Sequence, residues 1–137
     1  MNNEPEWYSY TNPKIKISIL KEKVKKVFVL EDDENERIPW FKKTFSFVDY
    51  LMITKSIKVG LAEIHNEKFD LIFLDHDLET DEQATTLGYD IRKTINRETE
   101  CIVHSMNPTG AGNLVKSHPF NIVHVPYFML QKNLEIV

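Results

Sequence analysis

The chain has 137 residues, of which 42% are hydrophobic and 28% are charged, as expected for one soluble globular domain with a core of its own. A net charge of −4 argues against long double-stranded nucleic acid as a partner, and no apolar stretch reaches the ~20 residues of a membrane-spanning helix, so no membrane contact is expected. Cys101 is the only cysteine and the N-terminus lacks a secretory signal, which predicts a cytoplasmic protein without disulfides.

The first part of the chain carries little core pattern. Ile15, Ile17 and Ile19 alternate with polar residues, which predicts one half-exposed strand. We therefore expect residues 1–26 to form an extension that packs on the main domain, residues 27–137.

From residue 27 onward, short apolar runs alternate with segments of helical spacing, which predicts strands separated by helices. The helices are indicated by apolar residues three or four positions apart, and Ser56 is placed to cap one of them. The apolar positions of the first three helices are Ile38, Phe41 and Phe45, then Ile57, Leu61 and Ile64, then Leu87, Ile91 and Ile95, and a fourth, short helix lies within residues 106–118. The predicted strands cover residues 27–31, 48–54, 70–75, 100–105 and 121–125.

This alternation predicts a parallel sheet with right-handed crossovers. An acidic turn after the first strand favours the flavodoxin-like strand order 2-1-3-4-5, so we expect an α/β three-layer sandwich with a five-stranded parallel sheet. Few residues follow Val125. The closing helix after the fifth strand should therefore be reduced or absent, with a short strand or a single turn in residues 127–137.

Acidic side chains follow the first and the third predicted strands. Glu31, Asp32 and Asp33 follow the first strand, and Asp75 and Asp77 follow the third. The carboxyl ends of parallel strands meet at one edge of the sheet, where carboxylates repel unless a cation lies between them. Glu31, Asp32, Asp33 and Asp75 are therefore candidate ligands of Mg²⁺ or Mn²⁺, which prefer oxygen ligands. The alternative is that such a cluster only caps a helix, as Asp33 could do.

Two histidines accompany these acids. His76 lies between Asp75 and Asp77, and His104 precedes Ser105 at the end of the fourth strand. Imidazole titrates near neutrality, so both are candidates for proton transfer. The alternative for His104 is that it is a hydrogen-bonded residue of the core. The remaining histidines are expected to be structural or on the surface, and they are His65, His118 and His124.

The segment after the fourth strand is rich in glycine and hydroxyl groups. Asn107 is placed to cap a helix that begins at Pro108. Amides at a helix N-terminus, with nearby hydroxyls and glycines, form a cradle for phosphate, although the segment would also suit an ordinary loop. Arg37, one turn beyond Asp33, is a further candidate, unless it is a solvated helix residue. The candidate phosphate-binding residues are Ser105, Asn107, Thr109, Gly110, Gly112 and Arg37.

From residue 27 onward the chain resembles a response-regulator receiver domain. The resemblance implies an acidic metal site, a phosphoaccepting aspartate at Asp75 and a metal-binding backbone carbonyl at Asp77. Receivers also carry a lysine before the proline that follows the fifth strand, whereas Val125 precedes Pro126 here, which argues against ordinary phosphoacceptor signalling. The matching residues are Glu31, Asp32, Asp33, Asp75 and Asp77, with Ser105 as the hydroxyl residue that ends the fourth strand.

A narrower resemblance is carried by Leu-Asp-His-Asp-Leu at residues 74–78, Gly-Tyr-Asp at 88–90 and Val-His-Ser-Met-Asn-Pro at 103–108. These segments are similar to the cyclic-phosphate-processing receiver family, a catalytic offshoot of receivers, over about residues 27–126. Glu79 departs from the glycine that family members often have. The resemblance implies action on cyclic phosphates of RNA ends or nucleotides.

The first hypothesis is a metal-dependent phosphoesterase that opens a 2′,3′-cyclic RNA end or a cyclic nucleotide. In it, Asp75, His76, Asp77, His104 and Ser105 are the candidate catalytic residues. The second is a non-catalytic module, either a degenerate receiver or a pocket that sequesters a cyclic nucleotide in signalling. The third hypothesis interprets residues 75–77 as the Asp-x-Asp motif of a haloacid-dehalogenase-type phosphatase. That family places the two aspartates after its first core strand, whereas here an acidic strand precedes them.

Overall fold

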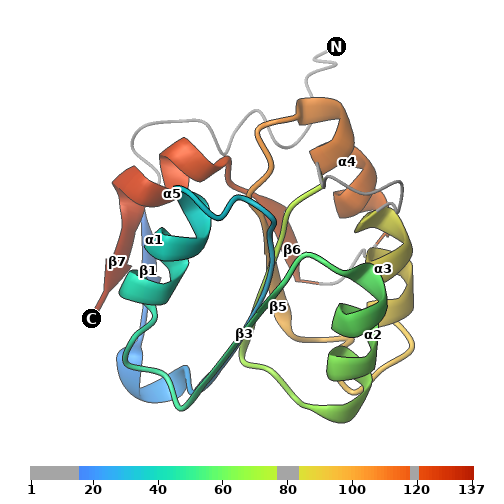
Figure 1. Cartoon of the computed structure of the whole chain (residues 1–137), viewed down its shortest axis with the longest axis horizontal. Helices are drawn as coiled ribbons and strands as arrows, with labels where there is room; N and C mark the ends of the chain where they lie inside the picture. Colours follow the sequence, from blue (N-terminus) through green and yellow to red (C-terminus); the bar gives the residue numbers. More distant parts are fainter. Residues whose placement is uncertain (1–15, 77–83, 118–120) are drawn as a thin grey trace.

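A computed structural model of the chain describes residues 16–76, 84–117 and 121–137 (Figure 1). Five strands form a parallel sheet in the order β3-β2-β4-β5-β6, and two short strands pair separately as β1-β7. Counted in chain order within the large sheet, this is the predicted order 2-1-3-4-5. The strands are β1 (Ile17–Ile19), β2 (Lys26–Leu30), β3 (Tyr50–Thr54), β4 (Leu71–Leu74), β5 (Glu100–Val103), β6 (Ile122–His124) and β7 (Leu134–Ile136).

The helices cover both faces of this sheet. In Figure 1, α1 and α5 lie on one face together with β1 and β7, and α2, α3 and α4 lie on the other. This confirms the predicted α/β sandwich. Among the described residues, no helix combines the length and the apolar character that crossing a bilayer requires. The helices are α1 (Arg37–Thr44), α2 (Ile57–Asn66), α3 (Ala84–Ile91), α4 (Pro108–Ser117) and α5 (Tyr127–Asn133), with a 3₁₀ turn η2 (Lys21–Lys23) after β1.

The strands that carry the candidate site end level with one another. Leu30 of β2 pairs with Leu74 of β4, Leu74 pairs with Val103 of β5, and Val103 pairs with His124 of β6. Apart from Lys26 at the start of β2, the strands β2 and β4 are apolar and buried, as expected for central strands of a parallel sheet covered on both faces. The residues that follow the paired row therefore emerge side by side.

Helix α2 shows how the local sequence sets the packing. The Ser56 side chain accepts a hydrogen bond of 3.1 Å from the N–H of Val59, which confirms the predicted cap. A Cβ at Gly60 would lie 2.9 Å from Cζ of Phe28, so glycine lets this helix approach the sheet closely. The inward face of the helix is the one predicted, because Ile57 and Ile64 are buried.

The beginning and the end of the described chain meet in a small parallel pair. Ile17 pairs with Leu134 and Ile19 with Ile136, against the sheet face that α1 and α5 cover. The alternation at Ile17 and Ile19 thus reflects a strand, while Ile15 lies outside the described residues. The closing helix α5 is reduced to seven residues, longer than the predicted single turn, and β7 follows it directly.

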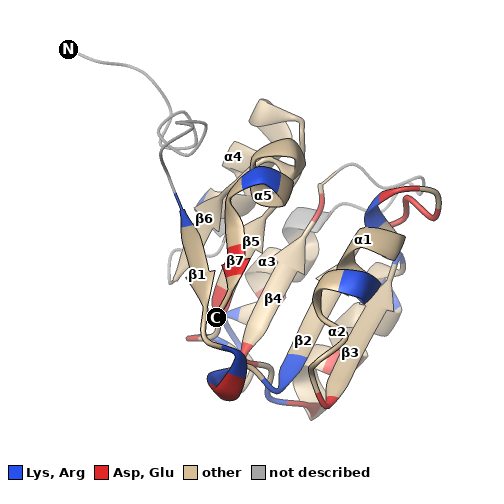
Figure 2. Ribbon diagram, turned by 90° about the vertical axis from the view of Figure 1, so that its left-hand side faces the viewer, with Lys and Arg blue, Asp and Glu red and all other residues tan. Residues whose placement is uncertain are grey.

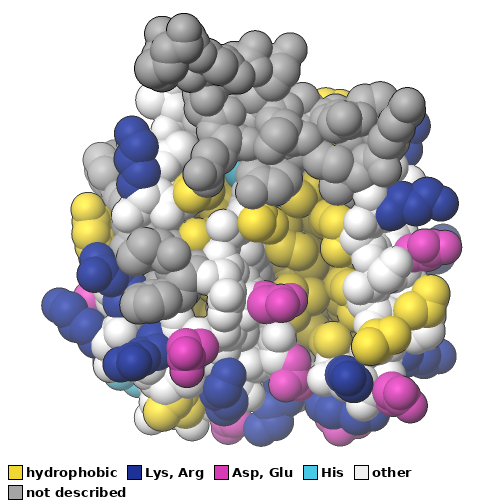
Figure 3. Space-filling model, turned by 180° about the vertical axis from the view of Figure 1, so that it is seen from behind, with side chains coloured by type: hydrophobic (Ala, Val, Ile, Leu, Met, Phe, Trp, Pro, Cys, Tyr) yellow, Lys and Arg dark blue, Asp and Glu magenta, His cyan; other side chains and the backbone are white. Residues whose placement is uncertain are grey.

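The edge strands of the large sheet, β3 and β6, bear partly buried hydrophobic side chains. The face opposite to that of Figure 1 shows hydrophobic side chains in a hollow with lysine, arginine and acidic side chains around it (Figure 3). Charged residues around such edges are a common way to prevent pairing with another chain.

One sequence expectation about α3 is wrong. Ile95 was expected on the inward face of this helix, but the helix ends at Ile91 and the Ile95 side chain is 54% exposed. Asn96 is the residue that turns inward instead. Its Oδ1 accepts the N–H of Phe69 at 2.7 Å, and its Nδ2 donates to the carbonyl oxygens of Ile64 and Glu67 at 2.7 Å.

Asn96→Ala should lower the free energy of unfolding by about 2–4 kcal/mol, because it leaves buried backbone groups on two segments without partners. Urea denaturation measures the change. Asn121→Ala is the matched control, since the exposed Asn121 side chain donates one bond to the carbonyl of Glu98. Equal effects of the two substitutions would contradict a structural role specific to Asn96.

Candidate functional site

Three polar side chains form a buried row at the carboxyl edge of the sheet. Glu31, Asp75 and His104 each follow the last paired residue of β2, β4 and β5. The ladder continues through them, because the N–H of Asp75 donates to Leu30 O at 3.1 Å and the N–H of His104 donates to Leu74 O at 3.0 Å. All three residues are at most 1% exposed. The structure thus brings together two of the predicted metal ligands and one predicted proton-transfer residue.

Glu31 and His104 form a close pair although they are 73 positions apart. Oε1 of Glu31 lies 2.6 Å from Nε2 of His104, and Oε2 accepts the N–H groups of Asp32 and Asp33 at 3.0 Å. Burial pushes the pKa of Glu31 upward, but His104, the Asp33 N–H and Arg37 outweigh it and lower the pKa below its usual value. Glu31 is therefore an ionised acceptor that orients the imidazole.

The second nitrogen of that imidazole has no such partner. Nδ1 of His104 is buried and makes no hydrogen bond with any residue that the structure describes. The ring lies edge-on to Phe41, with 5.1 Å between ring centroids. A buried polar atom without a partner costs free energy unless a ligand, water or ion satisfies it. His104 is thus enclosed on one side by the core and available for hydrogen bonding at Nδ1.

Arg37, the first residue of α1, projects onto the row. Its Nη1 lies 3.5 Å from Oδ2 of Asp75 and 3.7 Å from Oε1 of Glu31, and its Nε lies 3.9 Å from Oδ2 of Asp33. The guanidinium also stacks over the Tyr127 ring at 5.1 Å. Figure 2 shows the acidic residues concerned, at the end of β4 and in the loop before α1. Arg37, a predicted phosphate ligand, is therefore held by carboxylates here.

The other predicted acidic ligands have different surroundings. Oδ1 of Asp33 accepts the N–H groups of Asn35 at 3.1 Å and Glu36 at 3.3 Å, so this carboxylate stabilises the turn before α1, although it does not cap the helix itself, whose N-cap is Glu36. Asp32 is half-buried in the same loop. Asp77 lies outside the described residues.

The donor atoms of the row suit a metal ion. One ligand atom each from Glu31, Asp75 and His104 lie within 4.8 Å of one another. Carboxylate oxygen and imidazole nitrogen are both common ligands of divalent cations. A cation bound to Nε2 of His104 would replace the proton shared with Glu31, whereas a cation on Glu31 and Asp75 alone would leave that pair intact. The described residues thus offer a buried group able to hold a metal ion.

The fourth place in the row belongs to an apolar residue. Val125, at 2% exposure, follows β6, and its N–H donates to Val103 O at 2.9 Å. The next residues begin α5, where the N–H of Tyr127 donates to His104 O at 2.9 Å. The buried Tyr127 hydroxyl has no hydrogen-bond partner among the described residues, and burial raises its pKa to about 12. Tyr127 was not among the site residues predicted from the sequence. The available signal was an aromatic residue directly after Pro126, the proline that follows the fifth strand of the large sheet.

The loop after β5 is shaped by Asn107. Its Oδ1 accepts the N–H of Gly110 at 3.2 Å, and α4 begins at Pro108, which confirms the predicted cap. The Asn107 N–H donates to Oγ of Ser105 at 3.1 Å. The resemblance to receivers matched Ser105 to the hydroxyl residue that ends the strand, but His104 occupies the row and Ser105 lies one residue beyond it. Ser105 is fully buried, whereas Thr109 is exposed.

His124 supports this loop from the neighbouring strand. Its Nε2 lies 2.7 Å from the carbonyl oxygen of Ser105, and burial lowers its pKa, so a neutral ring donates its Nε2 proton to that carbonyl. This is a structural role. His65 is exposed on α2, and His118 lies outside the described residues.

Gly110 meets His76 across the site. A Cβ at Gly110 would lie 2.8 Å from Cε1 of the His76 ring and closer still to Nδ1 and Cγ. A Cβ at Gly112 would meet nothing within 4 Å. The two glycines were predicted to let a phosphate approach the backbone, but the lack of a side chain at Gly110 makes room for the half-buried imidazole of His76.

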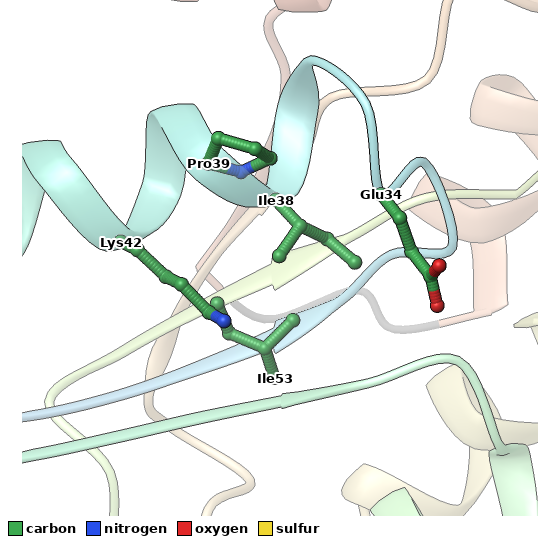
Figure 4. A pocket seen from close by; sticks show the side chains of 5 residues that line it. All are labelled: Glu34, Ile38, Pro39, Lys42 and Ile53. Carbon is green, nitrogen blue, oxygen red and sulfur yellow. The ribbon is translucent and has the colours of Figure 1, made fainter.

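A shallow hollow of about 410 Å³ lies between α1 and β3, close to the acidic loop (Figure 4). Figure 4 shows Ile38 and Ile53 at its floor with Glu34 and Lys42 on either side. None of the predicted site residues lines this hollow. The buried row is therefore the candidate functional site.

Comparisons with known proteins agree with this fold. Residues 26–118 match the family model described as cyclic-phosphate processing receiver domain. No curated protein matches the chain.

Solved structures show the same fold. A CheY-like response-regulator receiver domain protein from Methanospirillum hungatei JF-1 is 21% identical with a TM-score of 0.59, and the match covers 75% of this chain and 82% of that one. The signal receiver domain of an HD domain-containing protein from Pseudomonas fluorescens Pf-5 is 13% identical with a TM-score of 0.61, covering 80% and 94%. The Francisella response regulator 1452 receiver domain is 22% identical with a TM-score of 0.57, covering 78% and 88%. At these identities the likeness shows a receiver-like fold.

Proposed function

The chain belongs to the cyclic-phosphate processing receiver family, and on this premise we propose that it is a metal-dependent phosphoesterase that opens cyclic phosphates. Its substrates would be 2′,3′-cyclic ends of RNA or cyclic nucleotides. The observation that carries the proposal is the buried row, where Glu31, Asp75 and His104 bring ligand atoms within 4.8 Å of one another beside Arg37.

Glu31 and Asp75, with Asp32 from the adjoining loop, would hold Mn²⁺ or Mg²⁺. A site that includes the His104 nitrogen favours Mn²⁺, whereas carboxylates alone suit Mg²⁺ as well. When bound, such an ion polarises the phosphoryl oxygens and lowers the pKa of a coordinated water. The backbone N–H groups on Oε2 of Glu31 and its bond to His104 keep that carboxylate ionised and fixed for this purpose.

The two candidate histidines, His76 and His104, would have different roles in the reaction. His104 is fully buried between Glu31 and Phe41, so it orients Glu31 as a positioning residue. His76 is half-buried at the edge of the site, so its imidazole can reach a bound substrate. Opening the ring forms a bond from water oxygen to phosphorus and breaks one ester bond. The attacking water releases one proton to solvent, and the departing alkoxide needs a proton. His76 would deliver that proton.

The start of α4 would receive the phosphate oxygens. Thr109 is exposed there, and Asn107 fixes the first turn of the helix through Gly110. Amides at a helix N-terminus and a hydroxyl group together favour an anion. In this arrangement the phosphate would lie beside His76, which packs against Gly110.

The test is incubation of the chain with Mn²⁺ and a panel of cyclic mononucleotides and 2′,3′-cyclic RNA, read by liquid chromatography. Turnover that a chelator removes supports the proposal. Absence of turnover over the whole panel, with folded protein that binds Mn²⁺, would refute it.

Gly110→Ala should lower kcat by about 10²-fold, because the added methyl group would overlap the His76 imidazole and displace it from its position beside the substrate. His76→Gln should lower kcat at least as much, because glutamine cannot deliver a proton to the departing alkoxide. Gly112→Ala is the matched control on the same helix, since its Cβ meets nothing within 4 Å. A Gly110→Ala protein as active as Gly112→Ala would contradict the role given to His76.

The second candidate function is a phosphoacceptor receiver. It is favoured by the place of Asp75 at the end of β4 beside the cation of Arg37, in a receiver-like fold. Incubation with acetyl phosphate followed by intact-mass measurement separates the two. A mass increment of one phosphoryl group that Asp75→Asn removes would favour the receiver, whereas the apolar Val125 in the row predicts no stable increment.

A further inference from the structure

We propose that Arg37 is the resident counter-ion of the buried row and that it competes with a divalent cation for Glu31 and Asp75. This inference rests on the proposed function, because the cation concerned is the metal ion of that site. It assigns to Arg37 control over metal affinity, in place of the simple phosphate contact expected from the sequence.

The first argument is position. Nη1 of Arg37 lies 3.7 Å from Oε1 of Glu31 and 3.5 Å from Oδ2 of Asp75. These two carboxylates also belong to the group that can hold a metal ion. One guanidinium nitrogen therefore faces both carboxylates that a metal ion would bridge.

The second argument is how Arg37 is held. Its side chain is 22% exposed, its Nε lies 3.9 Å from Oδ2 of Asp33, and its guanidinium carbon lies 5.1 Å from the centre of the Tyr127 ring. Tyr127 is itself tied to the row, because its N–H donates to the carbonyl of His104. The guanidinium can therefore stay stacked on the Tyr127 ring when a metal ion binds the two carboxylates.

The third argument is charge. Glu31 and Asp75 are at most 1% exposed, and two buried carboxylates side by side repel each other without a cation. Arg37 supplies one positive charge without any bound ion. A divalent cation brings two more into the same region and meets repulsion from the guanidinium. Removal of the Arg37 charge should therefore raise the affinity of the row for a divalent cation.

The experiment is isothermal titration calorimetry of Mn²⁺ into the full metal-free chain at pH 8. Arg37→Gln is expected to bind Mn²⁺ about tenfold or more tightly than the unmodified protein, because the nearby positive charge is gone. Lys42→Gln removes the same charge from an exposed position of the same helix, and its affinity should stay within about twofold. Equal or weaker binding by Arg37→Gln would overturn the proposal, as would absence of Mn²⁺ binding in both proteins.

Thermal unfolding gives a second readout, independent of activity. Without metal, Arg37→Gln should unfold at a lower temperature than the unmodified protein, and saturating Mn²⁺ should raise its Tm by more. If Arg37→Gln is unfolded without metal, folding on addition of Mn²⁺ supports the proposal, and a chain unfolded in both conditions overturns it. Failure of the proposed function gives a different result. In that case no cyclic phosphate is turned over, while the unmodified protein and Arg37→Gln still differ in their affinity for Mn²⁺.

Discussion

Asp75→Asn is expected to lower kcat for cyclic-phosphate hydrolysis by about 10³-fold while the chain remains folded. Asp75 lies in the middle of the row, is 1% exposed and takes Nη1 of Arg37 at 3.5 Å. Asparagine keeps the shape of the side chain but removes the charge that would hold the metal ion. Initial rates at saturating Mn²⁺, with far-ultraviolet circular dichroism to confirm folding, measure the effect.

The matched control is Asp49→Asn, which removes the same charge from an exposed aspartate just before β3. Its kcat should stay within about twofold of the unmodified protein, since charges separated by more than a Debye length are largely screened. A folded Asp75→Asn protein with the activity of Asp49→Asn would show that the chemistry takes place elsewhere.

His104→Leu should lower the free energy of unfolding at pH 7 by about 3–5 kcal/mol, because it leaves the buried Glu31 carboxylate without its closest partner. The pair is joined at 2.6 Å with both side chains fully buried. Replacing both residues, as Glu31→Leu with His104→Leu, should recover most of this loss, since a buried pair exchanged for apolar residues of similar size is often neutral. Urea denaturation of the two single variants and the double variant tests the coupling. Additive losses would contradict it.

The same pair predicts a dependence on pH. The pKa of Glu31 is lower in the folded chain than its ordinary value of 4.5, so its contribution to stability is full above that value and is lost as the pH falls through the folded pKa. In His104→Leu the bond to His104 that lowers this pKa is gone, so the pKa of Glu31 should be higher than in the unmodified protein. The difference in unfolding free energy between the two proteins should therefore shrink between pH 7 and pH 4. A constant difference would mean that Glu31 is not the group that titrates.

The architecture could be predicted from the sequence because each element carries its own local signal. After Lys26, β2 is continuously apolar, as β4 is throughout, which is typical of buried parallel strands, and the two strands are followed by Glu31 and Asp75. Ser56 and Asn107 mark helix starts through short-range hydrogen bonds that any chain with this local sequence can make. The end of the chain was harder, because β7 exists through pairing with β1 from the other end of the sequence.

The composition of the row could be predicted only in part, because it depends on register. A shift of one residue turns a side chain to the other face of the sheet, so spacing alone could not choose between His104 and Ser105 as the neighbour of Asp75. The bond from Glu31 to His104 joins residues 73 positions apart, and nothing local encodes it. The family resemblances included Asp75 and His104 at their strand ends but gave no reason to expect the contact of His104 with Glu31.

The contacts that the first turns of α1 and α4 make with the site were beyond sequence reasoning altogether. Gly110 looked like a glycine that admits a phosphate, yet the group nearest to it is the His76 ring. Arg37 looked like a phosphate ligand, yet its guanidinium lies against Glu31 and Asp75. Both residues lie at this edge of the sheet, and each one meets a side chain that the sequence did not indicate as its partner.

Hydrolysis of an RNA oligomer with a 2′,3′-cyclic phosphate in ¹⁸O-labelled water, with Mn²⁺ present, tests the assignment of a phosphoesterase most directly. Mass spectrometry of the product should show a phosphomonoester that carries one ¹⁸O atom, because water oxygen forms the new bond to phosphorus. The product should be absent with chelator and with Asp75→Asn. A cyclic end that stays intact in the presence of folded, Mn²⁺-bound protein would contradict the assignment.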